Sequence, residues 1–202
     1  MKRRGFLQKL VAGAVVLATG TLPFGITLLL APWSAVPERN YLRPPGALKD
    51  EASFVAACIG CGLCGEVCPP RSIQFHAHDG GREVNTPFID PEDKACTLCN
   101  KCMEVCPTEA LTITPRDEID MGIAQIDRAA CYPWGDKGIC GACVSICSLG
   151  NKAIGFMMWN QYRPVVKRGC VGCGLCVEVC PHPSKPIWIV DSSQETVAKH
   201  RV

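Results

Sequence analysis

Sixteen of the 202 residues are cysteines, and their regular spacing constrains the fold more strongly than any other feature of the sequence. They fall into four groups that begin at Cys58, Cys96, Cys131 and Cys170, so one unit of 35 to 39 residues is used four times. Three groups read C-x2-C-x2-C-x3-C-P, whereas the group that begins at Cys131 has eight residues before its next cysteine and Ser148 in place of the proline. The sixteen cysteines are Cys58, Cys61, Cys64, Cys68, Cys96, Cys99, Cys102, Cys106, Cys131, Cys140, Cys143, Cys147, Cys170, Cys173, Cys176 and Cys180.

The rest of the composition leaves little material for an ordinary hydrophobic core. Hydrophobic residues make up 48% of the chain, but only about 40% once the cysteines are set aside, against a usual share of about 45–50%. We therefore expect groups bound to the cysteines to contribute much of the stability of the fold. The 21 lysines and arginines barely exceed the 19 acidic residues, so the chain lacks the basic excess of a nucleic-acid-binding protein, and no nucleic acid is expected as a partner.

The spacing C-x2-C-x2-C-x3-C-P is the bacterial ferredoxin run, which binds iron-sulfur clusters. Gaps of two residues let one tight loop direct three thiolates at three irons of one 4Fe-4S cluster, while the fourth cysteine ligates a neighbouring cluster. Because sixteen cysteines form four complete sets, we predict four 4Fe-4S clusters with all sixteen cysteines as iron ligands. The residues leave the pairing of the groups open: neighbouring groups would close shorter loops, and a nested pairing would join the first group to the fourth and the second to the third.

Other uses of clustered cysteines fit this spacing less well. Eight disulfides would suit an exported protein, but four cysteines within 11 residues are too close together to pair outward without strain. Zinc sites use cysteine pairs that are well separated in sequence, and a thioredoxin-like motif would occur once in a βαβ unit. Residues 60–65 match G-x-G-x-x-G literally but contain two cysteines of the first group and follow no strand, so no dinucleotide site is expected. His182, just after Cys180-Pro181, is a candidate for hydrogen bonding to a cluster.

The segments between the cysteine groups are similar to one another and predict the architecture. The residues after the second or third cysteine of each group suit a short helix, and each linker then contains two short apolar stretches that read as strands paired in a hairpin. The paired stretches are residues 72–75 with 86–90, 110–113 with 121–127, and 153–156 with 163–167. We therefore predict an α+β fold of tandem bacterial-ferredoxin-like βαββαβ modules over residues 51–190, followed by a polar tail at 191–202.

The N-terminal 50 residues predict export and membrane attachment. Residues 1–9 are basic and contain the pair Arg3-Arg4, which resembles a twin-arginine signal, the route for proteins that fold before export. Residues 10–30 carry no charge and would rise about 31 Å as a helix, enough to cross a hydrocarbon core of about 30 Å, and no clean cleavage site follows them. We expect an anchor that is retained, a proline-rich linker at 31–50, and a body on the periplasmic side of the cytoplasmic membrane.

Taken together, these features resemble the NapG/MauM-type ferredoxin-like proteins, which are periplasmic subunits with four ferredoxin runs. The matching features are the start Arg3-Arg4-x-Phe6-Leu7, the stretch from Leu42 to Ala47 ahead of the first run, and the long gap after Cys131. The resemblance implies a quinol-oxidising membrane partner of the NapH/MauN kind and electron delivery to a periplasmic c-type cytochrome or reductase.

The sequence therefore predicts an electron-transfer protein, a subunit of a quinol dehydrogenase-type oxidoreductase complex with no catalytic site of its own. It contains no Walker A run, no C-x-x-C-H haem attachment, and no serine, histidine and acid grouping that suggests catalysis. Two other functions stay open at this point. One is a maturation factor that helps assemble a periplasmic redox enzyme, and the other is a bound β-type subunit of a molybdenum oxidoreductase, which would usually lack its own export signal.

Overall fold

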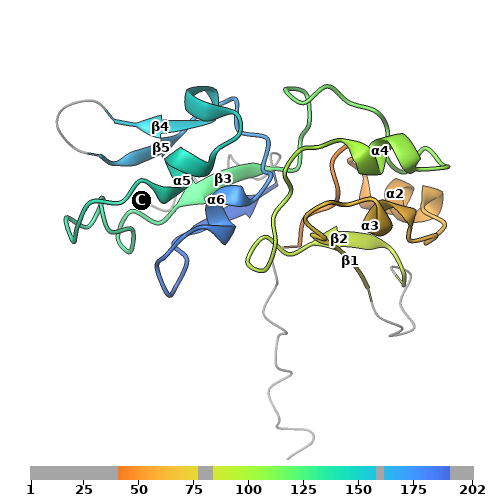
Figure 1. Ribbon diagram of the computed structural model, residues 1–202, viewed down its shortest axis with the longest axis horizontal. Coiled ribbons are helices and arrows are strands. Elements are labelled where there is room, and N and C mark those ends of the chain that lie inside the picture. The colour runs from red at the N-terminus through yellow and green to blue at the C-terminus, as the bar shows by residue number, and fades with distance from the viewer. Residues whose placement is uncertain (1–40, 77–83, 158–161, 192–202) are drawn as a thin grey trace, which may run out of the picture. The chain divides into compact units, whose positions relative to one another are not determined.

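The computed structural model describes residues 41–76, 84–157 and 162–191 (Figure 1). All described residues belong to one compact unit, which lies within Asn40–Val202. The predicted signal, the apolar stretch, residues 31–40 of the linker and most of the polar tail lie outside the described residues. Within the ranges given above, no helix is long and apolar enough to cross a membrane.

Residues 41–112, which we call module one, carry the first two cysteine groups. Their elements are α2 (Glu51–Ala57), α3 (Leu63–Glu66), β1 (Ile73–Phe75), β2 (Pro87–Ile89) and α4 (Lys101–Val105). The predicted hairpin of β1 and β2 is confirmed, with Ile73 opposite Ile89 in an antiparallel pair. A bridge between Ala47 and Leu111 joins the two ends of the module, and α3 packs beside α4.

Residues 121–191, which we call module two, carry the other two groups. Their elements are β3 (Ile123–Ile126), α5 (Ala142–Ile146), the 3-10 turn η1 (Gly150–Lys152), β4 (Ile154–Phe156), β5 (Pro164–Val166), α6 (Leu175–Glu178) and β6 (Ile187–Val190). β4 and β5 form the predicted hairpin, β3 pairs antiparallel with β6, and α5 packs against α6 (Figure 1). The module thus has the βαββαβ order, and the predicted α+β class is confirmed.

The predicted hairpin between residues 110–113 and 121–127 is wrong. Leu111 bridges to Ala47, whereas β3 pairs along its whole length with β6. The reason is that the first and last strands of a βαββαβ module pair with each other. The two stretches are neighbours in sequence, but one ends module one and the other begins module two.

The helices that follow the cysteine loops are short, and three of them begin directly after a residue in the left-handed backbone conformation. α3, α4 and α6 have four or five residues, and each follows a left-handed residue: Gly62, Asn100 or Gly174, with φ of 79°, 65° and 86°. Glycine adopts this conformation at no steric cost, and asparagine tolerates it better than most residues. A Cβ atom at Gly174 would stand 2.6 Å from the Cβ of Pro91, so the available space also requires glycine there.

Residues 41–50, which the sequence analysis assigned to the linker, are part of module one and pack against the rest of it. Leu42 is buried and exchanges two backbone hydrogen bonds with Ile89, at 2.8 and 2.9 Å. The carbonyl of Gly46 accepts a hydrogen bond from the Thr112 amide at 2.8 Å. This stretch therefore supplies the edge that closes module one.

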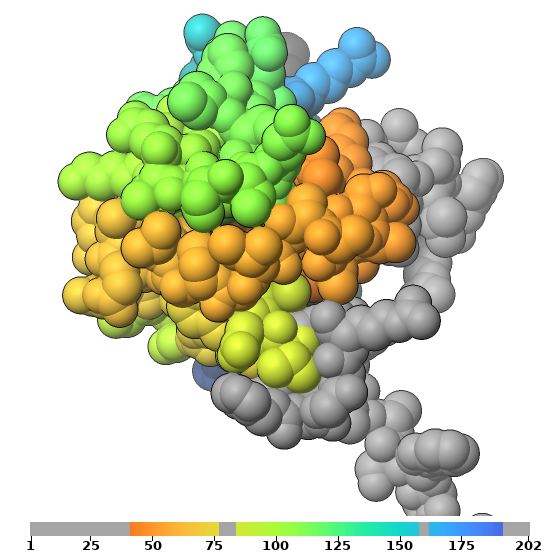
Figure 2. All heavy atoms as spheres, turned by 90° about the vertical axis from the view of Figure 1, so that its right-hand side faces the viewer, coloured from red at the N-terminus to blue at the C-terminus, as the bar shows by residue number. Residues whose placement is uncertain are grey.

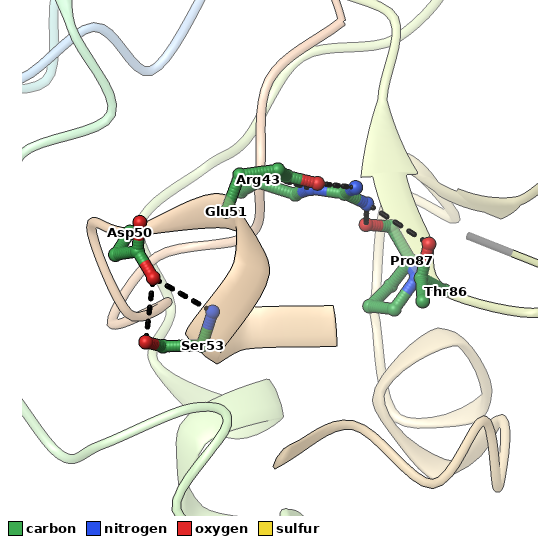
Figure 3. A network of polar contacts seen from close by, with 6 residues as sticks. All are labelled: Arg43, Asp50, Glu51, Ser53, Thr86 and Pro87. Atoms are coloured by element: carbon green, nitrogen blue, oxygen red, sulfur yellow. Dashed lines mark hydrogen bonds and ion pairs between the residues drawn. The ribbon is translucent and has the colours of Figure 1, made fainter. Parts of the chain in front are cut away.

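Arg43 holds residues 41–50 against the hairpin of β1 and β2. Its Nη1 donates to the carbonyl of Pro87 at 2.8 Å and to Oγ1 of Thr86 at 3.2 Å, and its guanidinium also pairs with Glu51 at the start of α2 (Figure 3). The guanidinium carbon lies 4.7 Å from the ring centroid of the buried Phe54, within the range of a cation–π contact. The side chain of Arg43 thus links residues 41–50, α2 and β2.

Cysteines form a large part of the hydrophobic core. The aliphatic and aromatic side chains that are almost fully buried include Phe54, Ile89, Leu98, Val177 and Ile189. They belong to one cluster with the buried cysteines Cys64, Cys68, Cys96, Cys102 and Cys176. Figure 2 shows the face of module one, where the orange segment that includes α2 lies between the green residues after α4 and the yellow-green residues near β2. The core therefore depends on the same side chains that the spacing assigns to iron.

Candidate metal centres

The structure brings the sixteen cysteines together in four sets of four. Each set consists of three cysteines of one group and the last cysteine of a partner group. Sets A, B and C each line one cavity, and set D consists of the four cysteines that line none of these three cavities. The sets are A (Cys58, Cys61, Cys64, Cys106), B (Cys96, Cys99, Cys102, Cys68), C (Cys131, Cys140, Cys143, Cys180) and D (Cys170, Cys173, Cys176, Cys147).

The pairing of the groups, which the sequence left open, is between neighbours. The last cysteine of each group follows the short helix that the loop begins. Because α3 packs beside α4 and α5 beside α6, this last cysteine lies at the set of the partner group. The first group is therefore paired with the second and the third with the fourth, and no set is built from one contiguous run.

The sets have the arrangement of free thiols that a 4Fe-4S cluster requires. All sixteen cysteines lie among the described residues, and none of them forms a disulfide. In the part of the chain that the structure describes, no three histidine, cysteine or acidic side chains are close enough together to hold one ion, as a zinc site requires. A 4Fe-4S cluster places each thiolate on a different iron, so its ligands stand farther apart. Four thiols around an apolar cavity therefore fit a cluster.

Burial makes the free thiols poor acids. It raises the pKa of Cys64 and Cys173 to about 11 and that of Cys96, Cys102 and Cys143 to about 12, and neighbouring thiols of the same set add to the shift. Backbone N–H groups oppose the shift, such as that of Leu98, which donates to Cys96 Sγ at 3.3 Å. A thiolate at these positions needs a compensating cation, so iron binding must release protons.

Two hydroxyl groups near the sulfurs are not apparent from the cysteine spacing. Ser72 Oγ lies 3.4 Å from Cys68 Sγ, and Thr108 Oγ1 lies 3.6 Å from Cys106 Sγ. Both cysteines are the last of their groups, and the hydroxyl residue follows within four positions. A serine or threonine soon after the cysteine-proline pair is the signal that would have identified them. Hydrogen bonds to ligand sulfurs tune the potential of an iron-sulfur cluster.

The insertion in the third group packs against the rest of module two. Trp134 Nε1 donates to the carbonyl of Pro164 at 2.9 Å, and the guanidinium groups of Arg128 and Arg163 lie 4.4 and 5.3 Å from its ring centroid. This packing holds the loop while Cys131 still reaches set C.

The candidate residue His182 lies at the cavity of set C, but its hydrogen bonds go elsewhere. Nδ1 of His182 accepts from the amide of Ser184 at 3.1 Å and lies 2.9 Å from the Ser184 hydroxyl. Its ring packs against Tyr132, with centroids 4.7 Å apart. The residue therefore contributes to the wall of the cavity.

Tandem modules that each enclose two sets of four cysteines define a ferredoxin-type iron-sulfur protein. Comparison with known protein families agrees, since residues 57–110 and 95–151 match the 4Fe-4S dicluster domain and residues 170–182 match a 4Fe-4S binding domain. The second dicluster match joins the second group to the third, whereas the structure pairs the third with the fourth.

The chain belongs to the family of the ferredoxin-type proteins MauM and NapG. It is 32% identical over 191 residues to the methylamine utilization ferredoxin-type protein MauM of Methylobacillus flagellatus, covering 89% of this chain and 79% of that protein. It is 34% identical over 169 residues to MauM of Paracoccus denitrificans, covering 78% and 74%. It is 32% identical over 193 residues to the ferredoxin-type protein NapG of Escherichia coli, covering 88% and 80%. The resemblance inferred from the sequence is confirmed, and with it ferredoxin-type electron transfer as the class of function.

Proposed function

We propose that the chain is a periplasmic, membrane-associated electron relay that holds four 4Fe-4S clusters. It receives electrons from a quinol-oxidising membrane protein of the NapH/MauN kind and passes them to a periplasmic c-type cytochrome or reductase. The observation that carries the proposal is that sixteen cysteines fall into four sets of four with none left over. A bound 4Fe-4S cluster supplies one-electron redox chemistry.

The residues around each set hold the ligands in place and limit the access of water. The cavity of set C, for example, is lined by Ile126, Pro133, Pro164 and Ile187. Backbone amides donate to ligand sulfurs, as Leu98 does to Cys96 and Ala124 does to Cys170 at 3.5 Å. Such groups stabilise negative charge on the sulfurs without adding a titratable side chain.

The location rests on the N-terminal sequence. A basic segment with Arg3-Arg4 ahead of 21 uncharged residues suits export of a folded protein by the twin-arginine route and retention at the membrane. Replacing both arginines with lysine should leave the protein in the cytoplasm. In spheroplasts, protease added outside should degrade the body of the unaltered protein but not that of the variant. If the protease degrades neither the unaltered protein nor the variant, the periplasmic location is contradicted.

The charge of the loaded protein indicates the character of its partners. Outside residues 1–9 the chain has 17 basic and 19 acidic residues. Four oxidised clusters, each with four thiolates, would add about −8. We therefore expect the partner surfaces to be basic and the association to weaken as ionic strength rises.

The number of clusters is tested by analysis of the purified protein. Iron and acid-labile sulfide should each be about 16 per chain. A value near 8 for each would contradict the prediction of four clusters, and stoichiometric zinc would contradict the iron-sulfur assignment.

The relay is tested by removing one ligand from each module. Cys61→Ala and Cys173→Ala should slow quinol-dependent reduction of the terminal enzyme while leaving that enzyme active with an artificial donor. Ser145→Ala, a change at an exposed serine of α5, is the control and should leave the rate unchanged. If a variant loses a cluster and the quinol-dependent rate stays the same, the relay is refuted. Loss of activity with the artificial donor as well would favour a maturation factor.

A further inference from the structure

We infer that the four centres form one linear chain in the order A, B, D, C, with the contact between the modules joining set B to set D. The order rests on the proposed function, because it needs all four sets to hold clusters. It makes the centres of the first and third cysteine groups the two ends of the chain and those of the second and fourth groups its middle. The cysteine spacing does not specify this order.

Within each module the two sets are in direct proximity. Cys64 of set A lies in α3, and Cys68 of set B follows the same helix, four residues further along the chain. α3 packs beside α4, which carries Cys102 of set B. In module two, Cys143 of set C lies in α5 and Cys147 of set D follows it, again four residues further along, and α5 packs against α6, which carries Cys176 of set D. This arrangement gives the two pairs A–B and D–C.

Between the modules, the ligand loop of set B lies against the ligand loop of set D. The amide of Cys96 donates to the carbonyl of Cys173 at 3.0 Å, so two iron-ligand residues are joined by one hydrogen bond. The absence of a side chain at Gly174 lets its backbone approach Pro91, as described above.

One side chain holds these two loops together from module two. Oε2 of Glu178 accepts a hydrogen bond from the amide of Ala95 at 2.7 Å, one residue before Cys96. The first group has Glu66 at the same position of its run, but Glu66 forms an exposed ion pair with Arg71 at 3.3 Å. Glu178 is therefore a positioning residue for the contact between sets B and D, and Glu66 is its natural control.

The cysteines are most buried at set B and most accessible at the two end sets. Three of the four cysteines of set B are buried, as is Cys176 of set D. Set A contains the buried Cys64 but also Cys61, the one exposed cysteine among the described residues, and no cysteine of set C is fully buried. Electron exchange with another protein requires a short distance to the surface, so the two end sets are the suitable points of entry and exit.

The order is tested with full-length protein from which one centre at a time has been removed. The variants are Cys61→Ala for set A, Cys99→Ala for set B, Cys140→Ala for set C and Cys170→Ala for set D. Each protein is first analysed for iron, then fully reduced with a europium(II) chelate, and its electron paramagnetic resonance spectrum is recorded for magnetic coupling between reduced centres. Iron well below four clusters in the unaltered protein would refute the proposed function itself, before the order is in question.

The linear order predicts a different result for end and middle sets. Removing set B or set D should leave one isolated centre and produce an uncoupled signal, whereas removing set A or set C should leave three centres in contact and produce none. If removing set A or set C also produces an uncoupled signal, the modules are not joined through sets B and D, and the order is refuted.

A second pair of variants leaves every ligand in place. Glu178→Ala should weaken the coupling between sets B and D at unchanged iron content, and Glu66→Ala should not. Identical spectra of the two variants would overturn the positioning role of Glu178. If Glu178→Ala failed to take up four clusters, Glu178 would be needed for assembly, which would also overturn the positioning role.

Discussion

Gly174→Ala is the substitution that tests most directly how the two modules approach each other. Gly174 lies between the ligands Cys173 and Cys176 with φ of 86°, and an added Cβ would be 2.6 Å from the Cβ of Pro91. Gly62 has the same position in the first group and φ of 79°, but an added Cβ there would have no heavy atom within 4 Å. Both substitutions force alanine into a left-handed backbone conformation, but only the one at Gly174 also brings the new methyl group too close to a neighbouring side chain.

The expected magnitudes follow from these two terms. An alanine in the left-handed conformation costs about 1–2 kcal/mol, which applies to both positions. Forcing a methyl group into packed structure costs a further 1–3 kcal/mol or so, which applies to Gly174 alone. We therefore expect a loss of about 1–2 kcal/mol for Gly62→Ala and about 2–5 kcal/mol for Gly174→Ala. At about 2–4 °C per kcal/mol, Gly174→Ala should unfold about 2–12 °C below Gly62→Ala.

The assay is anaerobic thermal unfolding of the loaded protein, followed by circular dichroism and by the absorbance of the clusters. Because loss of clusters makes unfolding irreversible, the unaltered protein, Gly62→Ala and Gly174→Ala are compared at one scan rate. Iron analysis before each scan ensures that equally loaded proteins are compared. If the two variants unfold at the same temperature, the close approach of Gly174 to Pro91 is refuted, and the contact between sets B and D loses its steric basis.

The remaining predictions concern the buried cysteines of the core, the contacts of Arg43 and the hydroxyl group beside Cys68. Removing iron with a chelator should unfold the body, because the buried cysteines form part of its core; an apoprotein that still unfolds cooperatively would contradict this. Arg43→Ala should destabilise the loaded protein by about 1–3 kcal/mol in the same thermal assay, whereas Arg71→Ala, which removes an exposed ion pair, should change it by less than about 1 kcal/mol; equal effects would refute the role of Arg43. Ser72→Ala removes the hydroxyl beside Cys68 and should lower the reduction potential of one centre in a spectroscopic redox titration; an unchanged potential would show that the hydroxyl does not act on the sulfur.

The local part of the site could be predicted from the sequence because it depends on short spacing. Two-residue gaps keep the first three cysteines of a run in one loop, and the helix before the fourth cysteine directs it to another set. The hairpins β1–β2 and β4–β5 could be predicted for the same reason, since their strands are connected directly and have an apolar pattern.

The non-local part could not be predicted in this way. The apolar pattern of Ile123–Ile126 indicates a strand but does not identify its partner, and the nearest stretch in sequence, residues 110–113, proved to belong to the other module. The pairing of the groups depends on which helices pack together, and that is decided by tertiary contacts between α3 and α4 and between α5 and α6. The contact between Cys96 and Cys173 joins loops that are distant in sequence, and no motif in either loop indicates it.

The two outer ends of the proposed chain of centres differ in a way that suits a relay between two different partners. At set A, Cys61 is exposed and the neighbouring Ile59 has 67% of its surface accessible, so this end is open. At set C, the insertion between Cys131 and Cys140 contributes Tyr132, whose ring packs against His182 at the cavity wall. The same insertion contributes Trp134, whose ring is contacted by two arginine side chains. A simple duplication of one module would have given two equal ends and hence equal affinity for donor and acceptor at each. The long gap after the first cysteine of the third group removes that symmetry, so each of the proposed partners would meet a surface of its own.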